Sequence, residues 1–365
     1  MSKIKISNLQ FALTISAYTF GVAPLFISSS IASISGRDAW ISAILAAVLG
    51  LSTVYINMYL GKLYPDKTLI ETICLSLGKW LGNIVSILFI FIIFETTAQI
   101  IWYVGDFLTT TYMPEVSAYP IDILFTAALI IAMLYGLEAM CRAVTIFFSI
   151  LFPFYFITLI MLFPNINITN VLPVLEYGIT PVIKGTVPLL SLCVWPLIVL
   201  NMIYPSNIKD LSKAKPSMLY GYLLGMFVAF SGVLMCILVL GDTFTAASRF
   251  PLFILTQEVN VGTILTRFEA VSVAVWLNNI FISAFFFFYA AAKGLSQIFK
   301  LSDHKKIVLP LGLILAAYSQ SIYKNVPFQI EWDTYVWPPV AFTFGVVLPV
   351  VMIIASICKK AAGKI

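Results

Sequence analysis

Among the Asp, Glu, Lys, Arg and His residues, Glu95 is the only one that the sequence places deep inside a long apolar segment. A carboxylate at the centre of a bilayer costs roughly 2.5–3.5 kcal/mol by insertion scales, and such residues usually face a bundle interior or a water path. Glu95 is therefore predicted to act in a proton relay, along a water path or close to a ligand. The alternative is a neutral carboxyl group that bonds a neighbouring backbone group or a hydroxyl such as that of Thr96 or Thr97.

Two other apolar segments contain residues that interrupt helices. Gly21 and Pro24 fall in the middle of the first, and the second contains Leu192-Cys193-Val194-Trp195-Pro196. Glycine disfavours helix, and proline also removes an amide donor. In hydrocarbon the freed backbone groups must find partners, and paired discontinuous helices form the binding sites of many transporters. The alternative for each segment is an ordinary proline kink.

These interruptions predict a binding site for a small zwitterion such as an amino acid. Amides of a half-helix N-terminus at Gly21 would attract an anionic group, and carbonyls near Cys193 would attract a cation. Core packing and interhelical hydrogen bonding are the alternatives for several members of the site. The predicted ligand-binding residues are Gly21, Val22, Ala23, Phe91, Cys193, Val194, Trp195, Asn279 and Ser283. Phe91 enters as part of an apolar wall, because it lies one helical turn from Glu95.

Catalytic and metal-binding arrangements are absent from the sequence. The single histidine, His304, has no serine or cysteine partner in a recognisable motif, and the five cysteines follow no disulfide or metal spacing. The sequence therefore argues against an enzyme and implies no cofactor or metal.

Composition shows what positions these residues. Of 365 residues, 61% are hydrophobic and 10% are charged, far below the roughly 25% charged residues of soluble proteins. The chain is predicted to be an all-α membrane protein with about ten spans. They cover 8–34, 38–62, 82–113, 118–136, 140–163, 180–204, 214–241, 266–294, 305–322 and 335–358. An amphipathic helix is predicted at 68–79, and a re-entrant or surface-lying segment at 250–255.

Charge predicts the orientation. Most of the 21 basic residues fall on the side that holds both termini, which is therefore predicted to be cytoplasmic. Most acidic residues, including Asp122 and Asp333, are assigned to the outer side. The basic residues are dispersed among loops, which argues against nucleic-acid binding.

The interrupted spans are the first and the sixth, so each opens a set of five. Sets with an odd number of spans have opposite topology. The sequence thus predicts one transmembrane domain, 1–365, built from inverted repeats at about 8–163 and 180–358.

Several short motifs resemble one family, the B subunits of spore germinant receptors, also called endospore germination permeases. The motifs are Gly78-Lys79-Trp80-Leu81-Gly82, Phe94-Glu95-Thr96, Phe152-Pro153-Phe154-Tyr155, Leu172-Pro173-Val174-Leu175, Arg267-Phe268-Glu269 with Trp276, and Tyr289-Ala290-Ala291-Ala292-Lys293-Gly294-Leu295. The family is similar to amino-acid–polyamine–organocation transporters. The resemblance therefore implies a LeuT-like fold, A and C receptor subunits as partners, and the spore inner membrane as location.

The sequence departs from the family pattern at both breaks. Ala23 replaces the second glycine of the family's first span, and Leu197 and Val199 stand where a glycine and a glutamate are common. The expected function is nutrient sensing by a receptor subunit that binds a small germinant at mid-membrane. A proton-coupled amino-acid permease that uses Glu95, and a subunit that binds no nutrient itself, remain alternatives.

Overall fold

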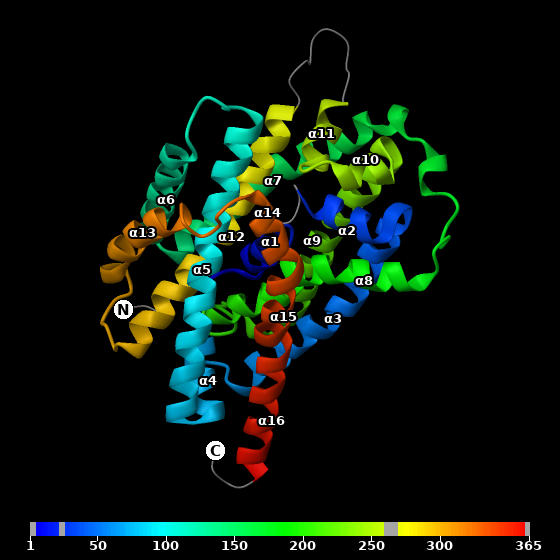
Figure 1. The fold of residues 1–365 in the computed structure, drawn as a ribbon. Helices are drawn as coiled ribbons and strands as arrows, with labels where there is room; N and C mark the ends of the chain where they lie inside the picture. The colour runs from blue at the N-terminus through cyan, green and yellow to red at the C-terminus, as the bar shows by residue number, and fades with distance from the viewer. Residues whose placement is uncertain (1–4, 22–25, 259–268, 362–365) are drawn as a thin grey trace.

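The computed structural model describes residues 5–21, 26–258 and 269–361. Within these residues the chain is almost entirely helical, and its β-structure is a single isolated bridge between Ile6 and Ile208. Helices are expected for such apolar runs, because hydrocarbon offers backbone groups no partner outside the chain. Figure 1 shows the long helices packed side by side, with the short helices α10 and α11 at one end of the bundle and α4 near the other.

The first five predicted spans correspond to helices in the first half of the chain. The first span is split into α1 (Asn8–Phe20) and α2 (Ile27–Ser35). Continuous helices follow as α3 (Ala39–Leu63), α5 (Lys79–Thr111), α6 (Ala118–Tyr135) and α7 (Leu137–Met161). The predicted amphipathic helix forms as α4 (Leu69–Leu77) and packs against α5. Single 3₁₀ turns complete this half as η1 (Gly36–Asp38), η2 (Phe163–Asn165) and η3 (Ile168–Val171).

The second half repeats this order. Its first span is the interrupted segment α8 (Ile179–Leu189), η4 (Leu190–Val194) and η5 (Trp195–Met202). The next helices are α9 (Leu211–Leu240), α10 (Asp242–Ala247), α11 (Pro251–Gln257), α12 (Glu269–Ile298) and α13 (Lys305–Ser319). The last segment consists of α14 (Val326–Glu331), η6 (Trp332–Val336), α15 (Trp337–Phe342), η7 (Thr343–Val347) and α16 (Leu348–Ala361). It begins well before the predicted residue 335, so Asp333 lies inside a helical segment and not in an outer loop.

Eight helical stretches in the described residues are long and apolar enough to cross a membrane. One of them, Ile27–Leu63, joins α2 to α3 through the turn at Gly36, whose φ of 55° suits glycine. Helices α1 and α13, with 13 and 15 residues, are too short to be counted alone. Each of the ten predicted spans nevertheless corresponds to a helix or a broken helix at the same place in the chain.

Helices α1 and α9 approach each other closely because α9 presents two glycines where they meet. A Cβ on Gly221 would lie 2.3 Å from the carbonyl oxygen of Ala12, and a Cβ on Gly225 would lie 2.7 Å from Cβ of Thr19. Glycines four residues apart are a common means of close helix approach in membranes. This packing fixes the position of α1 relative to the rest of the bundle.

Hydrogen bonds tie both described ends of the chain to neighbouring segments. The amide of Ile6 donates to the carbonyl of Asn207 at 2.8 Å, and the amide of Lys209 donates to the carbonyl of Ile6 at 2.9 Å. At the other end of the chain, α16 packs against α4, and Lys359 donates to the carbonyl of Leu75 at 2.7 Å. Because α4 also contacts η5, these contacts lie close together. An even number of spans would place both termini on the same side of the membrane. That this side is cytoplasmic stays a prediction.

Candidate functional site

The first helix break packs directly against α12. Helix α1 ends at Phe20, and a Cβ on the following Gly21 would lie 1.8 Å from Oγ of Ser283. The hydroxyl of Ser283 is buried and, within the described residues, has no hydrogen-bond partner. The structure therefore brings together two residues that the sequence predicted for one site. Val22 and Ala23 lie outside the described residues.

The second break is a change of helix type. Helix α8 widens into the π-turn η4 and then tightens into the 3₁₀ helix η5 at Trp195. Pro196 explains the change, because it has no amide to donate to the preceding turn. Its carbonyl oxygen accepts a hydrogen bond from the hydroxyl of Tyr18 at 3.1 Å, so the two breaks are directly joined. Tyr18 is buried and packs against Phe287 of α12, with 5.5 Å between ring centroids.

The three predicted residues of the second break have different surroundings. Cys193 and Val194 are buried. Trp195 is partly buried and packs edge-to-face on Phe342 of α15, and its carbonyl oxygen lies against Gly345 of η7. The carbonyl oxygen of Trp195 therefore faces the backbone of η7 in this conformation.

A small cavity, here called the central cavity, lies beside the second break. Its volume is about 20 Å³, which is room for one group of the size of a water molecule. Four helical segments contribute to its wall: α5, the second break, α12 and the last segment. Its lining residues are Thr96, Gln99, Ile100, Tyr103, Leu192, Pro196, Phe287, Asp333 and Trp337.

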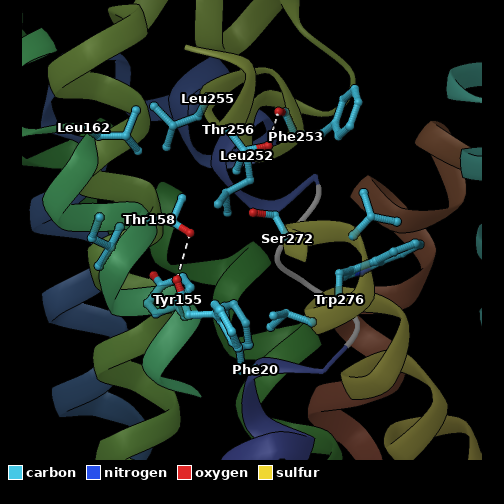
Figure 2. Close-up of a pocket in the computed structure, with 14 residues that line it drawn as sticks. Phe20, Tyr155, Thr158, Leu162, Leu252, Phe253, Leu255, Thr256, Ser272 and Trp276 are labelled. Atoms are coloured by element: carbon cyan, nitrogen blue, oxygen red, sulfur yellow. Dashed lines mark hydrogen bonds between the residues drawn. The ribbon is translucent and has the colours of Figure 1, made fainter. Parts of the chain in front are cut away.

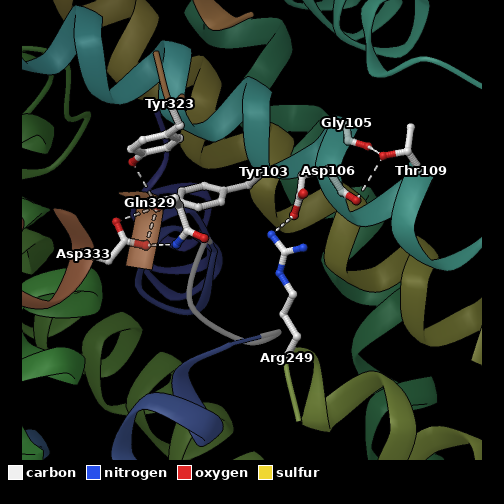
Figure 3. A network of polar contacts seen from close by, with 8 residues as sticks. All are labelled: Tyr103, Gly105, Asp106, Thr109, Arg249, Tyr323, Gln329 and Asp333. Carbon is white, nitrogen blue, oxygen red and sulfur yellow. Dashed lines mark hydrogen bonds and ion pairs between the residues drawn. The ribbon is translucent and has the colours of Figure 1, made fainter. Parts of the chain in front are cut away.

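Asp333 is the centre of a polar network at this cavity (Figure 3). The hydroxyl of Tyr103 lies 2.7 Å from both carboxylate oxygens, and the side-chain amide of Gln329 donates to one of them. The hydroxyl of Tyr323 lies 3.3 Å from that of Tyr103. The network connects α5, the loop after α13 and the last segment, so hydrogen bonds couple these three elements at the cavity.

A second cavity, the α11 cavity, lies under the short helix α11 (Figure 2). Its volume is about 50 Å³, and its wall is almost entirely apolar. Phe20 contributes from the first break, Tyr155 from α7 and Trp276 from α12. The segment before α11 is held in place by an ion pair between Arg249 and Asp106 of α5. Helix α11 contributes four residues to the wall of this cavity, Leu252, Phe253, Leu255 and Thr256. Whether the segment is re-entrant or surface-lying stays a prediction.

The remaining predicted residues lie in three different places. Asn279 is buried and lines a further small cavity with Phe20. Glu95 is partly buried, and its assignment to a coupling path stays a prediction. The placement of Phe91 is wrong, because its side chain is 57% exposed on the outside of the bundle.

Sequence reasoning missed the residues of α5 that do face the central cavity. Thr96, Gln99 and Tyr103 are three and four residues apart and therefore share one helix face. That spacing was a usable signal. Asp122, which the sequence assigned to the outer side, is fully buried and accepts a hydrogen bond from Gln320; the side on which it lies stays a prediction.

The hydrogen bond between the breaks leads to a prediction for Tyr18. Tyr18→Phe removes the donor to Pro196 while keeping the ring, and we expect the free energy of unfolding to fall by about 0.5–1.5 kcal/mol. Thermal unfolding of the purified protein measures this effect. Tyr220→Phe, at a tyrosine that is 69% exposed, is the matched control. Equal free energies of unfolding for the two variants would show that this hydrogen bond contributes nothing to stability.

Comparison with known proteins gives the family. The family model described as "Spore germination protein" matches residues 5–328. The chain belongs to this family. Spore germination protein KB of Bacillus subtilis (strain 168) is 26% identical over 364 residues, which cover 99% of this chain and 96% of that protein. Spore germination protein YndE of the same organism is 25% identical over 369 residues, covering 99% and 98%.

Comparison with solved structures shows the fold. One is Mhp1, a nucleobase-cation-symport-1 family transporter in a closed conformation with bromovinylhydantoin bound; its TM-score is 0.68 at 12% identity, covering 98% of this chain and 91% of Mhp1. The other is MhsT in complex with L-phenylalanine, with a TM-score of 0.66 at 13% identity, covering 98% and 99%. The predicted LeuT-like fold with broken first and sixth spans is confirmed. The relatives are germination proteins and the structural neighbours are transporters, so the chain is an integral membrane protein and not an enzyme.

Proposed function

We propose that this membrane protein senses a small nutrient, an amino acid, in the central cavity and passes that event on to trigger spore germination. The observation that carries the proposal is the hydrogen bond between Tyr18 and Pro196, which joins both helix breaks beside the cavity. Discontinuous helices that meet near the bilayer midplane are the usual place for a transporter ligand.

The size of the cavity supports sensing by conformational change. With about 20 Å³, the central cavity holds one water-sized group and not a whole amino acid. A ligand must therefore separate the segments that line the cavity before it fits. Binding to an opened state shifts the equilibrium toward that state, since a ligand favours the conformation that it binds better.

Partners and location follow from the family resemblance. Germinant receptor A and C subunits would receive the conformational change, and the spore inner membrane would hold the complex with both termini of this subunit in the cytoplasm. A proton-coupled amino-acid permease is the second candidate. It is favoured by Glu95, a partly buried carboxyl group within α5, since ionisable residues inside membrane spans commonly belong to proton relays.

The test combines binding with function. Purified protein is screened with the common amino acids by ligand-dependent thermal stabilisation, and spores with and without the protein are compared in germination rate. We expect Thr96→Met to remove both responses by filling the central cavity. Thr343→Met is the control, because Thr343 is an exposed threonine with the same hydrogen bond to a carbonyl four residues back. Equal responses from both variants would place the ligand elsewhere.

Uptake separates the two candidates. Proteoliposomes that hold the purified protein are given a radiolabelled amino acid and a pH gradient. Binding without net uptake agrees with a receptor. Gradient-driven uptake that Glu95→Gln abolishes would establish the permease, and absence of both binding and uptake would contradict both functions.

A further inference from the structure

Asp333 is a carboxylate in the membrane-spanning part of the chain that has no basic residue beside it. Its hydrogen bonds come from the neutral groups of Tyr103 and Gln329 (Figure 3). None of the ion pairs between described residues involves it. A carboxylate within a membrane span normally pairs with another group or lines a ligand or ion path. Because the described chain supplies no cation here, a positive group from another molecule is the natural partner.

The walls around Asp333 fit an ammonium group. The aromatic residues Tyr103, Phe287 and Trp337 line the same cavity. Aromatic rings attract cations through their faces, and a carboxylate forms strong charge-assisted hydrogen bonds with ammonium. The volume of about 20 Å³ accommodates one such group.

An apolar cavity, here called the adjoining cavity, lies next to the central cavity. The two share Thr96, Pro196, Phe287 and Trp337 as lining residues. The rest of the wall of the adjoining cavity consists almost wholly of hydrocarbon side chains from α5, η5 and the last segment, among them Ile93, Val199 and Phe344. A molecule that spans both cavities therefore meets a carboxylate at one end and hydrocarbon at the other.

We propose that Asp333 binds the ammonium group of the ligand while an apolar side chain of the same ligand enters the adjoining cavity. With a volume of about 20 Å³, the adjoining cavity must widen to admit that side chain, as the central cavity must to admit the ligand. This inference rests on the proposed function and narrows its ligand class to small primary amines with a branched aliphatic or aromatic side chain. Amino acids with charged side chains are excluded, because the adjoining cavity offers their charge no partner.

The first experiment needs no variant. Purified wild-type protein in lipid nanodiscs is titrated with L-leucine, with isoamylamine and with 4-methylpentanoate, which lacks the amine, and thermal stabilisation is recorded. We expect L-leucine and isoamylamine to stabilise the protein and 4-methylpentanoate to require roughly tenfold higher concentration or more. Equal stabilisation by the amine-free analogue would overturn the inference while leaving a small-molecule site in place. No stabilisation by any probe would overturn both the inference and the proposed ligand class.

The second experiment uses charge-removing variants. Asp333→Asn is expected to weaken L-leucine binding roughly tenfold or more. Glu331→Gln removes an exposed charge two residues away and is expected to leave binding unchanged. Thermal unfolding measured without ligand shows whether each variant is folded. If Asp333→Asn is not folded, the titration of the wild-type protein alone tests the inference. Unchanged binding by folded Asp333→Asn would contradict the inference, and so would stabilisation by sodium ions or by acid alone in place of the amine.

Discussion

Substituting Gly221 by alanine is expected to lower the free energy of unfolding by about 1–3 kcal/mol, because the added methyl group overpacks a filled interface. The new Cβ would lie 2.3 Å from the carbonyl oxygen of Ala12 and 2.9 Å from Cβ of Ile15. Neither atom can turn away, since the first is backbone and the second is fixed to it. Helices α1 and α9 must therefore separate, and the first break moves with α1. Thermal unfolding and the yield of monodisperse protein measure the effect.

Gly232→Ala is the matched control on the same helix. There the added Cβ would lie 3.1 Å from Cδ1 of Leu252, the mobile end of a side chain. We expect Gly232→Ala to change stability by less than half as much. If the two variants unfold alike, close approach of α1 and α9 is not what requires glycine at position 221.

Gly21→Ala is expected to disturb the candidate site itself, with a loss of about 1–3 kcal/mol in stability and a weakened ligand response. The added Cβ would lie 1.8 Å from Oγ and 3.1 Å from Cβ of Ser283. Rotation of the hydroxyl relieves the first contact only. Helix α12 must shift away from the first break, and Phe287 on α12 lines the central cavity.

A double variant makes this prediction specific. Of the three atoms nearest the added Cβ, Ser283→Gly removes the two of Ser283 and leaves only the carbonyl oxygen of Tyr18, at 3.0 Å. Gly21→Ala combined with Ser283→Gly should therefore recover at least half of the lost stability. Ser283→Gly alone serves as the reference. Strictly additive losses in the double variant would show that the two residues do not interact.

The sequence predicted the order of helices well, because long apolar runs between polar loops leave the chain few choices in a membrane. Both interruptions were predicted for the same reason: proline cannot donate the hydrogen bond that a continuous helix requires. The structure supports the second at Pro196, while Pro24 lies outside the described residues.

The candidate site was predicted less completely. Gly21 and Ser283 do meet, but Phe91 faces outward, because neighbouring helices and not spacing alone decide which face of α5 is buried. Asp333 was assigned to an outer loop, because the polar residues before it seemed to end the apolar run. Tyr103 of α5 donates to its carboxylate in the last segment, and a partner so distant in the sequence is not readable from local composition.

The bridge between Ile6 and Ile208 has a mechanical consequence. It ties the start of α1 to the chain just beyond η5. Stacking of Phe11 on Tyr204, with 5.6 Å between ring centroids, is a second contact between these segments. The hydrogen bond from Tyr18 to Pro196 is a third. Because these contacts recur along their length, the two half-helices are mechanically coupled. We therefore expect a displacement at either break to move both half-helices together.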